Sequence, residues 1–168
     1  MKQTFILLLC LASLLGCSKS NTSADAGKQI TFLATQDGSP IKIDTTLFDT
    51  PVAKTFLASG KNEYIGNTEA IEKGKKLFQL YSCTQCHGPE AGGQTGPNLH
   101  GPNFNYAKDA TNKGMFETIW HGTNGGMGAK GRGLMDPTDA NNGLKPDEVL
   151  LIQAWIRSHN PALTGNES

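Results

Sequence analysis

The sequence predicts an all-α domain of three or four helices wrapped by long loops. Apolar residues recur at helical spacing over 68–82, 113–121 and 146–159, whereas 88–110 and 122–144 are irregular and rich in glycine and proline. At 168 residues the chain is long enough for one compact domain and a tail. Loops longer than about 12–15 residues are uncommon in a compact domain unless something else orders them. We therefore expect a large, flat, apolar cofactor to complete the core.

The two longest predicted helices carry clear start and packing signals. Thr68 is positioned to cap the first of them, and Gly74 lies on its apolar stripe. Glycine inside a helix costs about 1 kcal/mol relative to alanine, so Gly74 predicts a close crossing with another helix. The last helix, 146–159, has Pro146 at its first position and acidic residues in its first turn. Its apolar face, which carries Trp155, is the expected partner of Gly74.

Two shorter elements are expected before these helices. The sequence Asp49-Thr50-Pro51 supplies a cap and a first-turn proline for a short helix that runs through Leu57 and is stopped by Gly60. Upstream, short alternating apolar patterns in 28–45 flank the turn sequence Asp37-Gly38-Ser39-Pro40. Such alternation around a turn predicts a β-hairpin.

The N-terminus is predicted to be a targeting segment rather than part of the fold. Lys2 precedes an apolar run of about eleven residues, which is too short for a bilayer, since spanning needs roughly 20. The run ends in Leu14-Leu15-Gly16-Cys17, which resembles the lipobox of bacterial lipoproteins. That resemblance implies cleavage before Cys17 and a lipid on this cysteine. An ordinary cleaved signal and an uncleaved anchor helix are the alternatives.

These expectations divide the chain into four parts. Residues 1–16 form a lipoprotein signal peptide, 17–42 a tether and N-terminal extension, 43–161 the main domain and 162–168 a C-terminal tail. A lipid would hold the protein on the periplasmic side of a membrane. Ser18 after the modified cysteine favours the outer membrane.

Charge and cysteine content exclude several classes of function. Lys and Arg number 15 and Asp and Glu also 15, with no basic stripe interleaved with aromatic residues, so we expect no nucleic-acid partner. Of the four cysteines, Cys10 leaves with the signal and Cys17 takes lipid, so that Cys83 and Cys86 remain. No cluster of acid, base and nucleophile lies near the motifs, and we therefore do not expect an enzyme.

The run Cys83-Thr84-Gln85-Cys86-His87 is the signature of c-type haem attachment. Two thiols at this spacing can add to the two vinyl groups of haem, and His87 then reaches the iron as an axial ligand. A thioredoxin-like motif would need a βαβ context, and half of a zinc site would need another Cys or His pair. The motif therefore predicts one covalently bound haem c and transfer of single electrons.

Four residues are candidates for the second axial ligand. Met127 lies in Gly125-Gly126-Met127-Gly128, where glycines let the backbone approach a porphyrin closely. Met135 is the runner-up, because a proline follows it shortly. Met115 lies on an apolar helix stripe that fits core packing better, and His121 would give bis-histidine ligation with a lower potential. An open sixth site, as in a haem sensor or enzyme, is the remaining alternative.

The segment after the haem motif resembles a loop of class I cytochromes c. Thr95-Gly96-Pro97-Asn98-Leu99 is similar to that loop in sequence and position. The resemblance implies the class I fold around one haem, with the Pro97 carbonyl accepting a hydrogen bond from His87 Nδ1. His100 in the same loop is expected to be a surface or packing residue.

A narrower resemblance, to cytochrome c-L, covers residues 43–159. The lead-in 49–64 and the motif Asn124-Gly125-Gly126-Met127-Gly128 are its discriminating parts. The resemblance implies a carrier that accepts single electrons from a PQQ-dependent methanol dehydrogenase and passes them to a smaller cytochrome c or a terminal oxidase. It also assigns the second axial position to Met127, and Lys130 stands where some members have a histidine. The lipobox is not usual in that family, and a lipid-tethered shuttle for an unrelated respiratory enzyme is the alternative.

Overall fold

The computed structural model describes residues 29–166 of the 168-residue chain. The expected signal peptide over 1–16, the lipid-bearing Cys17 and the tether as far as residue 28 lie outside the described residues. Within 29–166, no helix combines the length and the apolar character needed to cross a membrane.

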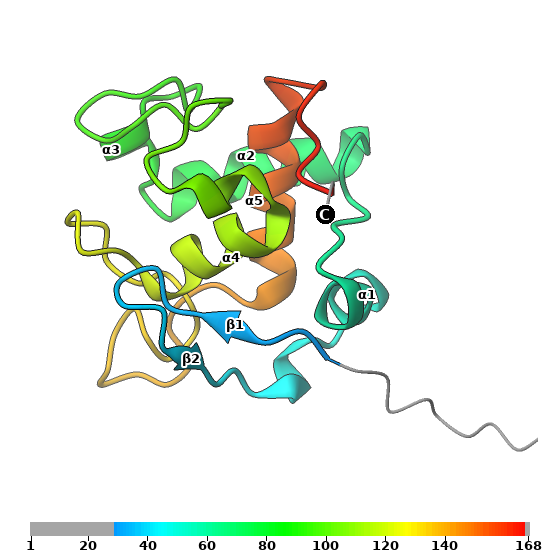
Figure 1. Ribbon diagram of the computed structural model, residues 1–168, viewed down its shortest axis with the longest axis vertical. Coiled ribbons are helices and arrows are strands. Elements are labelled where there is room, and N and C mark those ends of the chain that lie inside the picture. Colours follow the sequence, from blue (N-terminus) through cyan, green and yellow to red (C-terminus); the bar gives the residue numbers. More distant parts are fainter. Residues whose placement is uncertain (1–28, 167–168) are drawn as a thin grey trace, which may run out of the picture.

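Helices form most of the regular structure, which confirms the all-α prediction (Figure 1). The α-helices are α1 (Pro51–Ser59), α2 (Thr68–Leu80), α3 (Thr84–His87), α4 (Asn112–His121) and α5 (Pro146–Ser158). Two 3-10 helices, η1 (Thr45–Leu47) and η2 (Ala107–Ala110), lie in the connections. The strands β1 (Phe32–Leu33) and β2 (Pro40–Ile41) pair antiparallel, with Phe32 opposite Ile41, and form the predicted hairpin.

Helices α2 and α5 cross in close contact at Gly74. A Cβ atom added at Gly74 would lie 2.0 Å from the backbone oxygen of Leu151 and 3.0 Å from Cβ of Trp155. One turn further along α2, Phe78 packs on Trp155 with ring centroids 4.5 Å apart. The predicted crossing of these two helices is confirmed. Because the haem motif follows α2 directly, the crossing also fixes the position at which the motif begins.

The helix ends follow the expected signals at α1 and shift by one residue at α2. The Thr50 side chain caps α1 by accepting a hydrogen bond from the backbone N–H three residues on, and Gly60 ends the helix at a φ of 74°. The cap of α2 is Asn67 rather than the predicted Thr68, because the Asn67 side chain accepts the corresponding hydrogen bond at 2.9 Å. Asparagine and threonine are both good N-caps. Because the two residues are adjacent, the sequence alone could not show which of them caps the helix.

Helix α2 ends at Leu80, two residues before its predicted end. Ser82 adopts a φ of 58°, a left-handed conformation that is uncommon for a residue other than glycine and that stops the helix. The chain then begins a new helical turn, α3. This change of direction places Cys83, Cys86 and His87 on the wall of one cavity.

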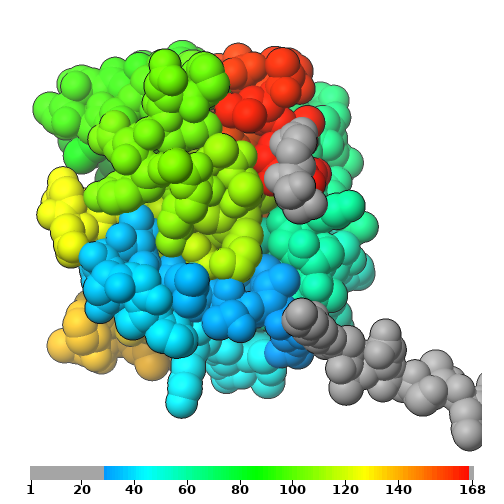
Figure 2. Space-filling model, viewed as in Figure 1, coloured from blue at the N-terminus to red at the C-terminus, as the bar shows by residue number. Residues whose placement is uncertain are grey.

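Four phenylalanine side chains, from segments that are far apart in the sequence, pack together beside α4 and form part of the core. Phe32 of β1 and Phe48 pack with Phe56 of α1 and Phe116 of α4, with ring centroids 4.9 to 6.3 Å apart. Each of the four is at most 4% exposed. Figure 2 shows the N-terminal segment, in blue, packed directly against the yellow-green side of α4. The N-terminal extension therefore contributes to the core.

Candidate haem site

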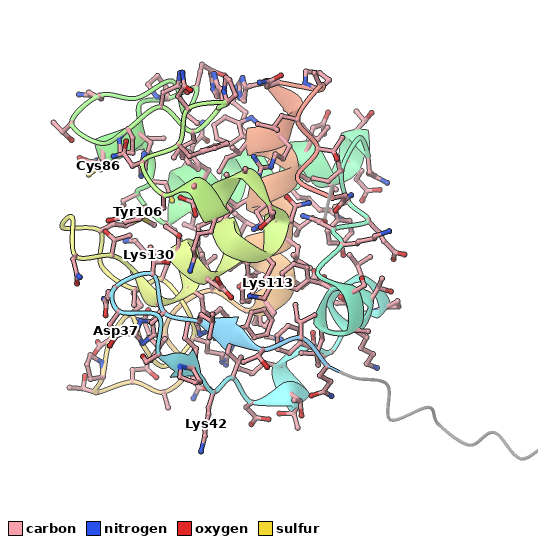
Figure 3. All side chains as sticks on the ribbon, in the orientation of Figure 1. Asp37, Lys42, Cys86, Tyr106, Lys113 and Lys130 are labelled. Atoms are coloured by element: carbon pink, nitrogen blue, oxygen red, sulfur yellow. The ribbon has the colours of Figure 1, made fainter. Side chains whose placement is uncertain are left out.

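A cavity of about 340 Å³ lies beside α3 and has the size of a cofactor site. Its walls come from the turn 82–87, the loop 95–99, the segment 104–109 and the loop 123–130. A smaller cavity of about 40 Å³ shares part of this lining and reaches core side chains of α2, α4 and α5. Figure 3 shows three residues of the larger cavity, Cys86, Tyr106 and Lys130, along one side of the molecule. The haem motif and the predicted ligand loop thus face the same space.

His87 lies on the cavity wall with 8% of its surface exposed. Its Nδ1 is 2.9 Å from the Pro97 carbonyl oxygen, and because a carbonyl can only accept, Nδ1 carries the proton and donates it. In the neutral imidazole this places the lone pair on Nε2, where a metal ion can bind it. Gly96 allows the contact, since a Cβ atom there would lie 3.1 Å from His87 Cε1. The imidazole is held in the tautomer that haem iron requires.

Cys83 and Cys86 are free thiols on the same wall. Cys86 is exposed and Cys83 is half-buried. Burial raises the pKa of the Cys83 thiol, and the Lys130 ammonium partly opposes this effect. Two unpaired thiols beside the imidazole of His87 fit the covalent attachment of haem c. The attachment at these two residues stays a prediction.

The candidates for the second axial ligand differ in position. Met127 lines both cavities. Met115 is buried in α4 with 3% of its surface exposed and lines the smaller cavity alone. Met135 is 40% exposed, and neither Met135 nor His121 is among the residues that line the two cavities. Met127 is the best placed of the four, and its ligation of iron stays a prediction.

Asp109 and Thr118 line both cavities, although no motif in the sequence indicated either residue. Thr118 Oγ1 donates a hydrogen bond of 2.7 Å to Asp109 Oδ1, and both residues are buried. Burial raises the pKa of Asp109 to about 6, although the Thr118 hydrogen bond and two nearby cations, Lys108 and Arg157, lower it. Arg157 Nη2 also donates to the Asp109 backbone oxygen at 2.7 Å. The cavity therefore contains a carboxyl group whose charge changes near neutral pH.

The family model described as cytochrome c matches residues 71–160, a range that includes the haem motif, Asp109 and Met127. The match covers more than half of the chain, which therefore belongs to the cytochrome c family. It is an electron-transfer protein that carries haem c.

Comparison with individual relatives indicates a narrower group within the cytochrome c family. Cytochrome c-L of Methylorubrum extorquens is 40% identical over 109 residues, which are 65% of this chain and 50% of that protein, so the chain spans about half the length of that relative. The crystal structure of cytochrome cL from the marine methylotrophic bacterium Methylophaga aminisulfidivorans matches at 35% identity with a TM-score of 0.66, over 77% of this chain and 81% of that one. Cytochrome cL from Hyphomicrobium denitrificans matches at 34% identity with a TM-score of 0.64, over 77% and 73%. The chain is a homologue of cytochrome c-L with the class I cytochrome c fold.

The raised pKa of Asp109 predicts a pH-dependent midpoint potential. As the pH rises through about 6 the carboxyl group ionises, and its negative charge beside the cavity favours the ferric state. We expect the potential to fall over this range, by at most about 59 mV per pH unit for one electron and one proton. Asp109→Asn keeps an acceptor for Thr118 and is expected to abolish the fall, leaving a higher potential at alkaline pH.

Spectroelectrochemical titration at a series of pH values measures this effect. Asp139→Asn, which neutralises an exposed aspartate outside the cavity lining, is the matched control and should follow the wild type. Parallel curves for the wild type and Asp109→Asn across the range would contradict the prediction.

Proposed function

We propose that this protein carries single electrons from a PQQ-dependent methanol dehydrogenase to a smaller cytochrome c or a terminal oxidase. The cavity that brings Cys83, Cys86 and His87 together with Met127 is the observation that carries the haem site. The similarity to cytochromes c-L, in two cases over 77% of the chain, supports the choice of donor.

Five residues form the proposed site. Cys83 and Cys86 would hold haem through thioether bonds, His87 Nε2 and Met127 Sδ would bind its iron, and Pro97 would orient the imidazole of His87. Bound haem supplies a one-electron iron couple, and a methionine ligand raises its potential. Cys86 and the glycines on either side of Met127 are exposed, so a partner can approach this side of the cavity closely.

The proposed location is the periplasmic face of a membrane, with the outer membrane favoured. A signal peptide over 1–16 and a lipid on Cys17 would place the protein there. Anchoring would raise the effective concentration of the carrier for partners at the same membrane.

The donor is tested by the rate at which a purified PQQ-dependent methanol dehydrogenase reduces the oxidised protein. We expect this rate to exceed that for an unrelated class I cytochrome c of similar potential at least about tenfold, equivalent to about 1.4 kcal/mol of specific recognition. Equal rates for the two cytochromes would refute methanol dehydrogenase as the donor. They would favour instead a shuttle for another respiratory enzyme.

A further inference from the structure

The N-terminal hairpin, residues 32–41, is fixed along α4 before it reaches the Met127 loop, which we define as residues 122–128. At its root, Phe32 is buried and packs on the ring of Phe116, with centroids 5.1 Å apart. The next backbone N–H along the hairpin donates to the buried carboxylate of Glu117 at 2.8 Å. The hairpin therefore has a firm base on the helix that leads into the Met127 loop.

The far end of the hairpin is bonded to the end of α4 and to the loop itself. The Thr35 and Thr118 hydroxyl oxygens are 2.9 Å apart, and because Thr118 uses its single proton to bond Asp109, Thr35 is the donor while Asp109 is ionised. Asn124 Nδ2 donates to the Gln36 backbone oxygen at 2.8 Å. Asp37 at the hairpin tip lies on the same side of the molecule as the cavity residues Cys86 and Lys130 (Figure 3). The hairpin thus reaches the segment that carries Met127.

The Met127 side chain packs against the core, but the glycines on either side of it have few neighbours. Thr123 N donates to the Met127 backbone oxygen at 2.8 Å, and Gly122 at a φ of 79° brings the two ends of the loop together. A Cβ atom added at Gly126 or Gly128 would meet no atom within 4 Å. Glycine has the greatest backbone freedom of any residue, so contacts from outside the loop add to what holds it in one conformation.

We propose that the N-terminal hairpin is a brace that holds the Met127 loop closed over the haem site, with the Asn124 to Gln36 hydrogen bond as its latch. Thr35 and Asn124 are thereby positioning residues for the sixth ligand. The inference rests on the proposed ligation of iron by Met127. It gives the N-terminal extension a role in electron transfer, since a loop that opens would expose the iron and lower its potential.

Imidazole binding to the ferric protein measures how often the loop opens, because imidazole takes the sixth position only when the methionine has left it. The apparent affinity is proportional to the fraction of protein in the open state. We expect Asn124→Ala to raise imidazole affinity about fivefold, equivalent to about 1 kcal/mol for one hydrogen bond. Thr35→Val should change the affinity in the same direction. Asn141→Ala, which removes an exposed asparagine from the neighbouring loop, is the matched control and should behave as the wild type.

The red charge-transfer band of methionine-ligated ferric haem is recorded for each protein before imidazole is added. A wild type that shows the band, together with unchanged imidazole affinity in Asn124→Ala and Thr35→Val, would overturn the brace and leave Met127 ligation intact. A wild type without the band would overturn Met127 ligation, and the brace with it. Equal increases in Asn124→Ala and Asn141→Ala would also count against the brace, because the effect would then not depend on contact with the hairpin.

Discussion

Replacement of Met127 by alanine is expected to open the sixth coordination site. The ferrous variant should bind carbon monoxide rapidly, while the untreated ferrous wild type should not, because Met127 competes for the same position. The midpoint potential should fall on the order of 100 mV, within the range of about 0.8 V that axial ligands control in haem proteins. Stopped-flow mixing with carbon monoxide and a potentiometric titration measure the two effects.

Met135→Ala is the matched control for this experiment. Met135 is 40% exposed and does not line either cavity, so its removal should leave carbon monoxide binding and the potential unchanged. Rapid binding of carbon monoxide by the wild type would instead show an open sixth site. A response in Met135→Ala but not in Met127→Ala would transfer the ligand role to Met135.

Features set by a few neighbouring residues were predictable from the sequence. The cap at Thr50, the proline that follows it and the stop at Gly60 all lie within one short helix, and α1 has the expected start. Gly74 also gave a correct long-range prediction, because glycine on the apolar stripe of a helix has few reasons other than close packing. The predicted end of α2 was wrong by two residues, because Ser82 adopts a left-handed conformation that is uncommon for serine.

Other features set by tertiary contact left no signal in the sequence. Asp109 lies in an irregular segment with no periodicity, where an acidic residue is usually solvated, and only the fold buries it beside Thr118. The predicted hairpin is a second example. Alternating residues indicated its strands, but they did not indicate that Gln36 would contact Asn124. Neither residue belongs to a pattern that indicates a partner, so this contact can be found only once the helices between them are placed.

Gly74→Ala is expected to destabilise the folded protein strongly, although alanine is the better helix former by about 1 kcal/mol. The added methyl carbon would lie 2.0 Å from the backbone oxygen of Leu151, and a backbone atom cannot move aside as a flexible side chain can. Helices α2 and α5 must therefore separate, which loosens the packing of Phe78 on Trp155. We expect a loss of more than about 3 kcal/mol, a large part of a typical total stability of about 5–15 kcal/mol.

Guanidinium unfolding of the haem-loaded protein, followed by tryptophan fluorescence, measures this loss. Gly92→Ala is the matched control, because a Cβ atom at Gly92 would meet only His100 Cε1, at 3.9 Å, and its unfolding midpoint should stay near that of the wild type. At Gly74 the higher helix propensity of alanine would raise the unfolding midpoint, whereas the steric clash with Leu151 would lower it. The direction in which the midpoint moves therefore shows which effect is larger. A raised midpoint in Gly74→Ala would mean that helix propensity outweighs packing there and that α2 and α5 do not approach as closely as described.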